Sequence, residues 1–86
     1  MSKSDQRLKT DITNLGLSSS GIPLYSFKYK KDTFAEKNYG DNLYHGCMAQ
    51  DLLSIDSQHP AVSINPTTGT YQVNYNLIDV DFYQIN

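Results

Sequence analysis

The most telling stretch of this chain is Ser4-Asp5-Gln6-Arg7-Leu8-Lys9-Thr10-Asp11-Ile12, which opens the sequence. It has neither the period of an amphipathic helix nor the alternation of a strand, so we expect an extended segment held by its neighbours. A second distinctive stretch reads Gly46-Cys47-Met48-Ala49-Gln50-Asp51. Gly46 and Ala49 permit close backbone approach, and the Gln50 amide can both donate and accept hydrogen bonds. We therefore expect the second stretch to pin the first.

The two stretches together resemble a known family, the intramolecular chaperone auto-processing domains that end many phage tail fibres and tailspikes. Those domains open with Ser-Asp-x-Arg-Leu-Lys and later carry Gly-x-x-Ala-Gln followed by an acidic residue. The resemblance continues through Val73-Asn74-Tyr75-Asn76-Leu77-Ile78. It implies a domain that drives a fibrous trimer to fold and then cuts its own chain once. It also implies a catalytic dyad of Ser4 and Lys9, with His45 and Gln50 near the processing site.

Such a dyad makes chemical demands on its two members. For the Ser4 hydroxyl to attack the backbone, Lys9 must be neutral, which requires burial to lower its pKa from about 10.4. Asp5 and Asp11 lie close in sequence, and nearby carboxylates favour the charged lysine. Residues at this spacing do not share a face of a helix or strand. Either the backbone bends sharply between them, or Lys9 serves the Ser4 of another subunit.

Length and composition set limits on the class of protein. The chain has 86 residues, so we expect one domain over residues 1–86 with a thin core that gains from subunit association. Its formal net charge of −2 argues against a nucleic-acid partner. We interpret Lys28, Lys30 and Lys31 as the solvated face and end of a strand. No apolar run is long enough to cross a membrane, and no signal-peptide core is present, so we expect no membrane partner.

The histidines and the one cysteine offer weaker candidates. Cys47 lies two residues after His45 and could form a thiol–imidazole pair, but a small buried cysteine is the commoner arrangement. His45 also fits an ordinary, partly exposed histidine. His45, Cys47 and His59 lack a recognised metal-ligand spacing, so we expect neither a metal nor another cofactor. A single cysteine suits assembly in a reducing cytoplasm.

The pattern of apolar residues predicts a small α+β fold, with an antiparallel sheet of three or four strands and one or two short helices. Residues 1–21 form an extended N-terminal segment and loop, because 14–21 is rich in serine and glycine. Tyr25, Phe27 and Tyr29 alternate with polar residues, which predicts a strand over 22–30. Residues 31–42 read as a loop in which Phe34 packs inward.

The second half of the chain is more regular. Residues 49–55 have helical spacing and should end near Asp56. Residues 61–65 and 70–75 flank Pro66-Thr67-Thr68-Gly69, which predicts a hairpin. Across it, Val62 and Ile64 should face residues 71, 73 and 75, all tyrosine or valine. The tail, 76–86, fits both a strand and a helix, and we favour a helix.

We expect a phage tail-fibre-associated assembly or structural protein of the virion, made in the host cytoplasm. It would form a homotrimer, with its seven tyrosines either filling the core or lying at subunit interfaces, and bind tail or fibre proteins. Only three residues precede Ser4, so a cut there releases little, which favours this role over an active peptidase. The alternative is a Ser/Lys autoprotease that cleaves itself once near Ser4 after trimer assembly. Glycan binding by exposed tyrosines is a third reading.

Overall fold

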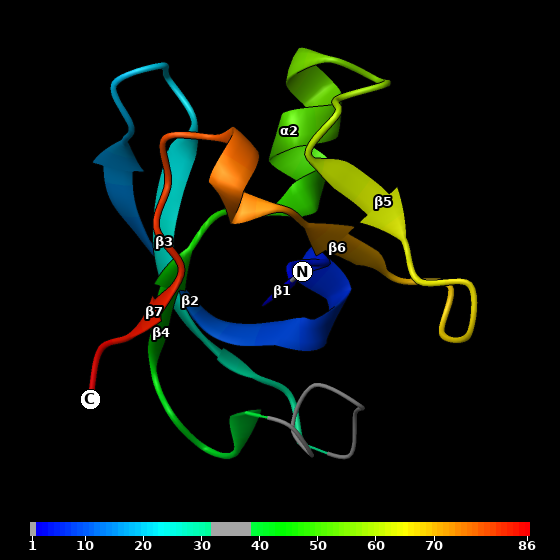
Figure 1. Ribbon diagram of the computed structural model, residues 1–86. Coiled ribbons are helices and arrows are strands. Elements are labelled where there is room, and N and C mark those ends of the chain that lie inside the picture. Colours follow the sequence, from blue (N-terminus) through cyan, green and yellow to red (C-terminus); the bar gives the residue numbers. More distant parts are fainter. Residues whose placement is uncertain (1, 32–38) are drawn as a thin grey trace.

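The computed structural model describes residues 2–31 and 39–86, so the predicted inward-facing Phe34 lies outside the described residues. Within these ranges the chain forms two antiparallel sheets, one short α-helix and two 3-10 turns (Figure 1). This arrangement confirms the predicted α+β class. None of the helices within these ranges has the length and apolar character that a membrane crossing requires.

The smaller sheet joins the start of the chain to the hairpin of its second half. Its strand order is β1-β6-β5, with β1 at Ser2–Lys3, β5 at Val62–Ile64 and β6 at Tyr71–Val73. Val62 pairs with Val73 and Ile64 with Tyr71, as the hairpin prediction required. Tyr75 lies beyond this pairing, in the 3-10 turn η2 at Tyr75–Leu77.

The larger sheet has the strand order β2-β3-β4-β7 in the described residues. Its strands are β2 at Lys9–Leu17, β3 at Pro23–Tyr29, β4 at Tyr44–Gly46 and β7 at Tyr83–Gln84. Strand β3 lies within the predicted 22–30 and buries Phe27 and Tyr29, so the alternation identified its inner face correctly. Helix α2 at Ala49–Ile55 follows β4 and ends at Asp56, as expected.

Strand β2 corrects the prediction of a loop over 14–21. It continues to Leu17, and only the turn before Ile22 is irregular. The strand carried no alternating signal because it lies at the edge of the sheet, with every residue from Asp11 to Leu17 exposed. Its register with β3 shifts twice, near Asp11 and near Gly16, where φ is 51° and 113°. These β-bulges further hide the period of the strand.

The tail corrects a second prediction, because residues 76–86 form no helix beyond the single 3-10 turn η2, which ends at Leu77. After η2 the chain runs extended, and β7 pairs with β4. Val80 packs into one apolar cluster and Phe82 into another, so the tail serves two packing surfaces, which one helical face could not do. The Asp79 carboxylate also accepts hydrogen bonds from Ser18 and Ser20, which ties the tail to the β2–β3 turn.

The core consists of two clusters that meet where β4 leads into α2. One cluster includes Cys47 and the other Met48. The first is aliphatic, with buried Ile22, Cys47, Ala49, Leu52, Ala61, Val73 and Val80. The second is aromatic, with buried Phe27, Tyr29, Tyr44 and Met48. The N-terminal segment from Ser4 to Lys9 packs against this junction.

Candidate functional site

The N-terminal segment is held by backbone and side-chain hydrogen bonds from α2 and β6. The Ala49 N–H donates to the Ser4 carbonyl oxygen at 2.8 Å, and the Ser4 N–H donates to the Tyr71 carbonyl at 3.3 Å. The Gln50 side chain accepts from the Gln6 N–H and donates to Asp5 Oδ1, each at 2.8 Å. This is the pinning by Ala49 and Gln50 that their residue types predicted.

Asp5 is fully buried, yet its charge is compensated. It caps the 3-10 turn η1 at Gln6–Leu8 and accepts hydrogen bonds from Arg7, at 2.7 Å from Nη2, from the Tyr71 N–H and from Gln50. Burial alone would raise the pKa of Asp5, but these hydrogen bonds, that of Arg7 foremost, hold it well below its ordinary value. The carboxylate is therefore committed to Arg7 and does not pair with Lys9.

Lys9 is buried, with only 2% of its surface exposed. Its Nζ donates to the Cys47 carbonyl oxygen at 2.8 Å and lies 3.8 Å from the centre of the Phe27 ring. Loss of solvation lowers the pKa of Lys9 to about 7, although the weaker influence of Cys47 and Asp5 opposes the shift. Asp11 is exposed at a bulge of β2. Lys9 thus meets the requirement for a base at neutral pH.

The Ser4 side chain is linked to the backbone of Cys47 through Tyr75. Its Oγ is 2.6 Å from the Tyr75 hydroxyl, which accepts a hydrogen bond from the Cys47 N–H at 3.2 Å and donates to the Cys47 carbonyl at 3.4 Å. Lys9 therefore bonds the Cys47 backbone directly, and Ser4 of the same chain is linked to it through the Tyr75 hydroxyl. The turn η1 between them supplies the sharp bend that regular structure would not.

The peptide bond before Ser4 is held at both of its polar atoms. The Tyr29 hydroxyl donates to the Lys3 carbonyl oxygen at 2.6 Å, and the Ser4 N–H is bound by Tyr71. Burial raises the pKa of Tyr29 and of Tyr75, so both phenols keep their protons. Neither tyrosine was identified from sequence. Tyr75 lies in the stretch that resembles the family, whereas Tyr29 gave only the signal of an inward-facing strand residue.

Gly46 makes room for this arrangement. A Cβ atom at this position would lie 2.7 Å from the Tyr75 hydroxyl oxygen and 3.3 Å from both Phe27 and Phe82. A side chain here would push Tyr75 away from Ser4. The close approach expected of Gly46 is thus the approach of a phenol.

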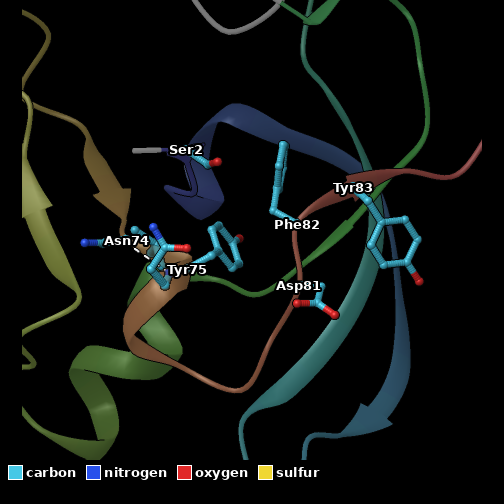
Figure 2. Close-up of a pocket in the computed structure, with 8 residues that line it drawn as sticks. Ser2, Asn74, Tyr75, Asp81, Phe82 and Tyr83 are labelled. Atoms are coloured by element: carbon cyan, nitrogen blue, oxygen red, sulfur yellow. Dashed lines mark hydrogen bonds between the residues drawn. The ribbon is translucent and has the colours of Figure 1, made fainter.

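A groove of about 580 Å³ borders the site on the side of β1 (Figure 2). Its lining includes Ser2 from the N-terminal strand, Tyr75 from η2 and Phe82 from the tail. Figure 2 shows the Tyr75 and Phe82 rings on the groove side of the N-terminal segment. Tyr75 thus lines the groove, and its hydroxyl bonds Ser4.

The remaining candidates have other surroundings. The His45 ring bonds the Asp81 carbonyl through Nδ1 at 2.7 Å and stacks on Tyr83, so these ring contacts are with the tail. Its predicted role at the site stays a prediction. The Cys47 thiol is buried, and burial raises its pKa, which opposes its use as a nucleophile. Over residues 2–31 and 39–86, no three His, Cys, Asp or Glu side chains are grouped to hold a metal ion.

Comparison with known proteins gave one match. A family model whose name marks a peptidase, and whose description is "chaperone of endosialidase", matches residues 4–60. The match covers more than half of the chain and takes in Ser4, Lys9 and Gln50. No curated protein and no solved structure matched.

Proposed function

Since the chain belongs to the chaperone-of-endosialidase family, we propose that it is the chaperone domain of a phage tail fibre or tailspike and that it cuts the backbone once, between Lys3 and Ser4. A chaperone role associated with phage tail proteins fits that family. The processing step is favoured here over the binding-only role expected from the sequence, because of the geometry around Cys47.

One observation carries the proposal: Ser4 and Lys9 are both buried, Lys9 bonds the Cys47 carbonyl, and Ser4 bonds the Tyr75 hydroxyl, which in turn bonds the Cys47 N–H of the same chain. Among the described residues, no carboxylate forms an ion pair with Lys9. Burying an ammonium group without a counter-charge is costly. If position 9 had only a structural role, an apolar residue would serve better than a lysine. A buried lysine with a pKa near 7 instead matches the needs of a general base.

The proposed chemical step uses Lys9 as the base and Ser4 as the nucleophile. Neutral Lys9 takes the Ser4 hydroxyl proton, and Ser4 Oγ bonds to the Lys3 carbonyl carbon, giving an oxyanion on the Lys3 oxygen. Collapse breaks the C–N bond, and the Ser4 nitrogen receives the proton from Lys9. The product is an ester between Lys3 and the Ser4 hydroxyl, with a free Ser4 amine. Water, which can approach along the groove beside Tyr75, hydrolyses the ester to a Lys3 carboxylate and a free Ser4 hydroxyl.

The test is a fusion of the whole chain to the end of a trimeric fibrous protein. We expect two fragments, the smaller of which begins at Ser4 by mass and terminal sequencing. Ser4→Ala and Lys9→Met should both leave the fusion intact. Ser2→Ala is the matched control, since it removes a hydroxyl from the same segment and should still be cut. A wild-type fusion that assembles as a trimer and stays uncut would refute the proposal.

Oligomerisation is the second part of the proposed role, and one observation supports it. Strand β2 is an edge strand and exposes Ile12, Leu15 and Leu17, with 41%, 50% and 66% of their surfaces accessible. Exposed apolar residues on an unpaired edge favour association with another chain. We propose a homotrimer that buries this edge and assembles with tail or fibre proteins in the virion.

A further inference from the structure

The Tyr29 hydroxyl, which is not part of the dyad, contacts the peptide bond that we propose is cut. The Lys3 carbonyl oxygen would carry the negative charge after attack by Ser4, and the Tyr29 hydroxyl already donates a hydrogen bond to it at 2.6 Å. This distance is at the short end for O–H···O hydrogen bonds. A donor already aimed at such an oxygen stabilises the developing charge.

We propose that Tyr29 is a catalytic residue for processing, in which its hydroxyl binds the oxyanion that forms on Lys3; this inference rests on the proposed cleavage before Ser4. The Tyr29 side chain also forms a hydrogen bond with the side chain of Tyr39. Its ring is buried in the aromatic cluster, stacked on Tyr39 at 4.2 Å and edge-on to Phe27 at 5.5 Å. The phenol is therefore fixed before the reaction and needs no reorganisation as charge develops.

The surroundings keep the phenol in the form that donates. Burial disfavours the phenolate, so Tyr29 retains its proton at neutral pH. Its ring also borders Lys9, whose Nζ lies 6.0 Å from the ring centre. Strand β3 thus presents Phe27 and Tyr29 to the two reacting groups, the first under the base and the second on the carbonyl.

The same cluster provides a matched control. Tyr44 is also buried, and its hydroxyl donates to the Tyr39 carbonyl at 2.9 Å, a bond that does not involve the N-terminal segment. Tyr29→Phe and Tyr44→Phe each delete one buried phenol hydroxyl bonded to a backbone carbonyl. A purely structural role for Tyr29 predicts similar effects of the two substitutions on processing.

The experiment measures the cutting rate of the trimeric fusion for wild type, Tyr29→Phe and Tyr44→Phe, with melting temperature and pH profile for each. Loss of one oxyanion donor should slow Tyr29→Phe by about 10²- to 10³-fold. Tyr44→Phe should cut at the wild-type rate. The pH midpoint should not move in Tyr29→Phe, since Lys9 sets it, so a shifted midpoint would instead indicate a disturbed Lys9 and count against the inference.

The possible outcomes distinguish a failure of the Tyr29 role from a failure of the proposed cleavage before Ser4. If wild type is cut and Tyr29→Phe is cut as fast as Tyr44→Phe, the role of Tyr29 is refuted while the proposed function stands. An uncut wild-type fusion refutes both. Should Tyr29→Phe unfold, replacement of Tyr29 by 3,5-difluorotyrosine keeps the hydroxyl and makes it a stronger donor; cutting should then accelerate, and an unchanged rate would refute the inference.

Discussion

Lys9 combines burial with the lack of a charged partner among the described residues, a costly state for an amine. Its Nζ keeps one backbone hydrogen bond, to Cys47, and the face of the Phe27 ring. Asp5, four residues before Lys9, forms an ion pair with Arg7 at 2.7 Å. The removal of the expected counter-charge is what lets desolvation lower the pKa of Lys9. The function proposed for Lys9 therefore opposes the stability of the fold.

The pH dependence of processing should report Lys9 directly. Because only neutral Lys9 accepts the serine proton, the cutting rate should rise about tenfold per pH unit below the pKa and level off above about 7. Single-turnover cutting of the fusion across this range is the measurement. Lys9→Arg should not cut at any pH, since a guanidinium stays charged. A rate independent of pH between 5 and 8 would contradict the role of Lys9.

The same shift should affect stability. Between the folded pKa of about 7 and the unfolded value of about 10.4, the unfolded chain binds more protons, so the free energy of unfolding rises with pH. Lys9→Met lacks this dependence. At pH 7 it should be more stable than wild type by about 0.5 to 2 kcal/mol, and this advantage should shrink toward pH 10. Urea unfolding at both pH values tests this, and a constant difference would argue against a buried, shifted Lys9.

At the scale of elements, the turn from β4 into α2 organises the site. Gly46, Cys47 and Ala49 contribute backbone groups or space, and only Gln50 acts through its side chain. Cys47 and Met48 in this turn also pack into the two core clusters, so little free space surrounds it. We therefore expect the turn to tolerate few changes of side-chain size.

Gly46→Ala should show this sensitivity. The added methyl group would lie 2.7 Å from the Tyr75 hydroxyl oxygen, and overpacking of this kind costs about 1 to 3 kcal/mol. Tyr75→Phe removes that oxygen, so the double variant should lose less stability than the sum of the two single changes. Thermal or urea unfolding of all four proteins completes the cycle. Additive losses would mean that the glycine and the phenol do not interact.

The elements that sequence reasoning predicted are those whose apolar residues recur at a clear helical or alternating period, or flank a recognisable turn. Strand β3, helix α2 and the hairpin of β5 and β6 belong to this group. Strand β2 was missed because its side chains face solvent, so its partner is β3 backbone and not a core. The tail was missed because Val80 and Phe82 enter different clusters.

The candidate site divides in the same way. Ser4, Lys9 and Gln50 were predicted from the resemblance, since hydroxyl, amine and amide groups are conspicuous in a motif. Tyr29 was not predicted, because a tyrosine in an alternating strand looks like any half-apolar core residue. The bond from its hydroxyl to Lys3 joins segments that are distant in sequence and depends on how the two sheets pack together.

At the scale of the whole molecule, the core is small, yet three large apolar side chains of β2 are left exposed. Burial of Ile12, Leu15 and Leu17 by another subunit would add apolar contact that the monomer lacks. In the same sheet, the opposite edge strand β7 is only two residues long, so β2 offers the longer edge for pairing.

Leu15→Lys combined with Leu17→Lys should therefore dissociate the proposed trimer, because charged side chains on an edge strand oppose pairing. Sedimentation velocity of the chain at micromolar concentration is the measurement. Ile55→Lys is the control, since Ile55 is similarly exposed, at 61%, but lies on α2. A monomeric wild type, or equal dissociation by the control, would exclude β2 as the interface.

The pairing of β1 with β6 has a consequence for what happens after the chemistry. Ser2 pairs with Val73 and Lys3 with Gln72, immediately upstream of the bond before Ser4. After cleavage, the segment that ends at Lys3 would still be held to the domain by these two strand pairs and by the Tyr29 hydrogen bond to Lys3. Scission and departure would then be separate events with separate rates. The fibre would then keep the cleaved domain bound until dilution, heat or a competing strand breaks the pairing of β1 with β6.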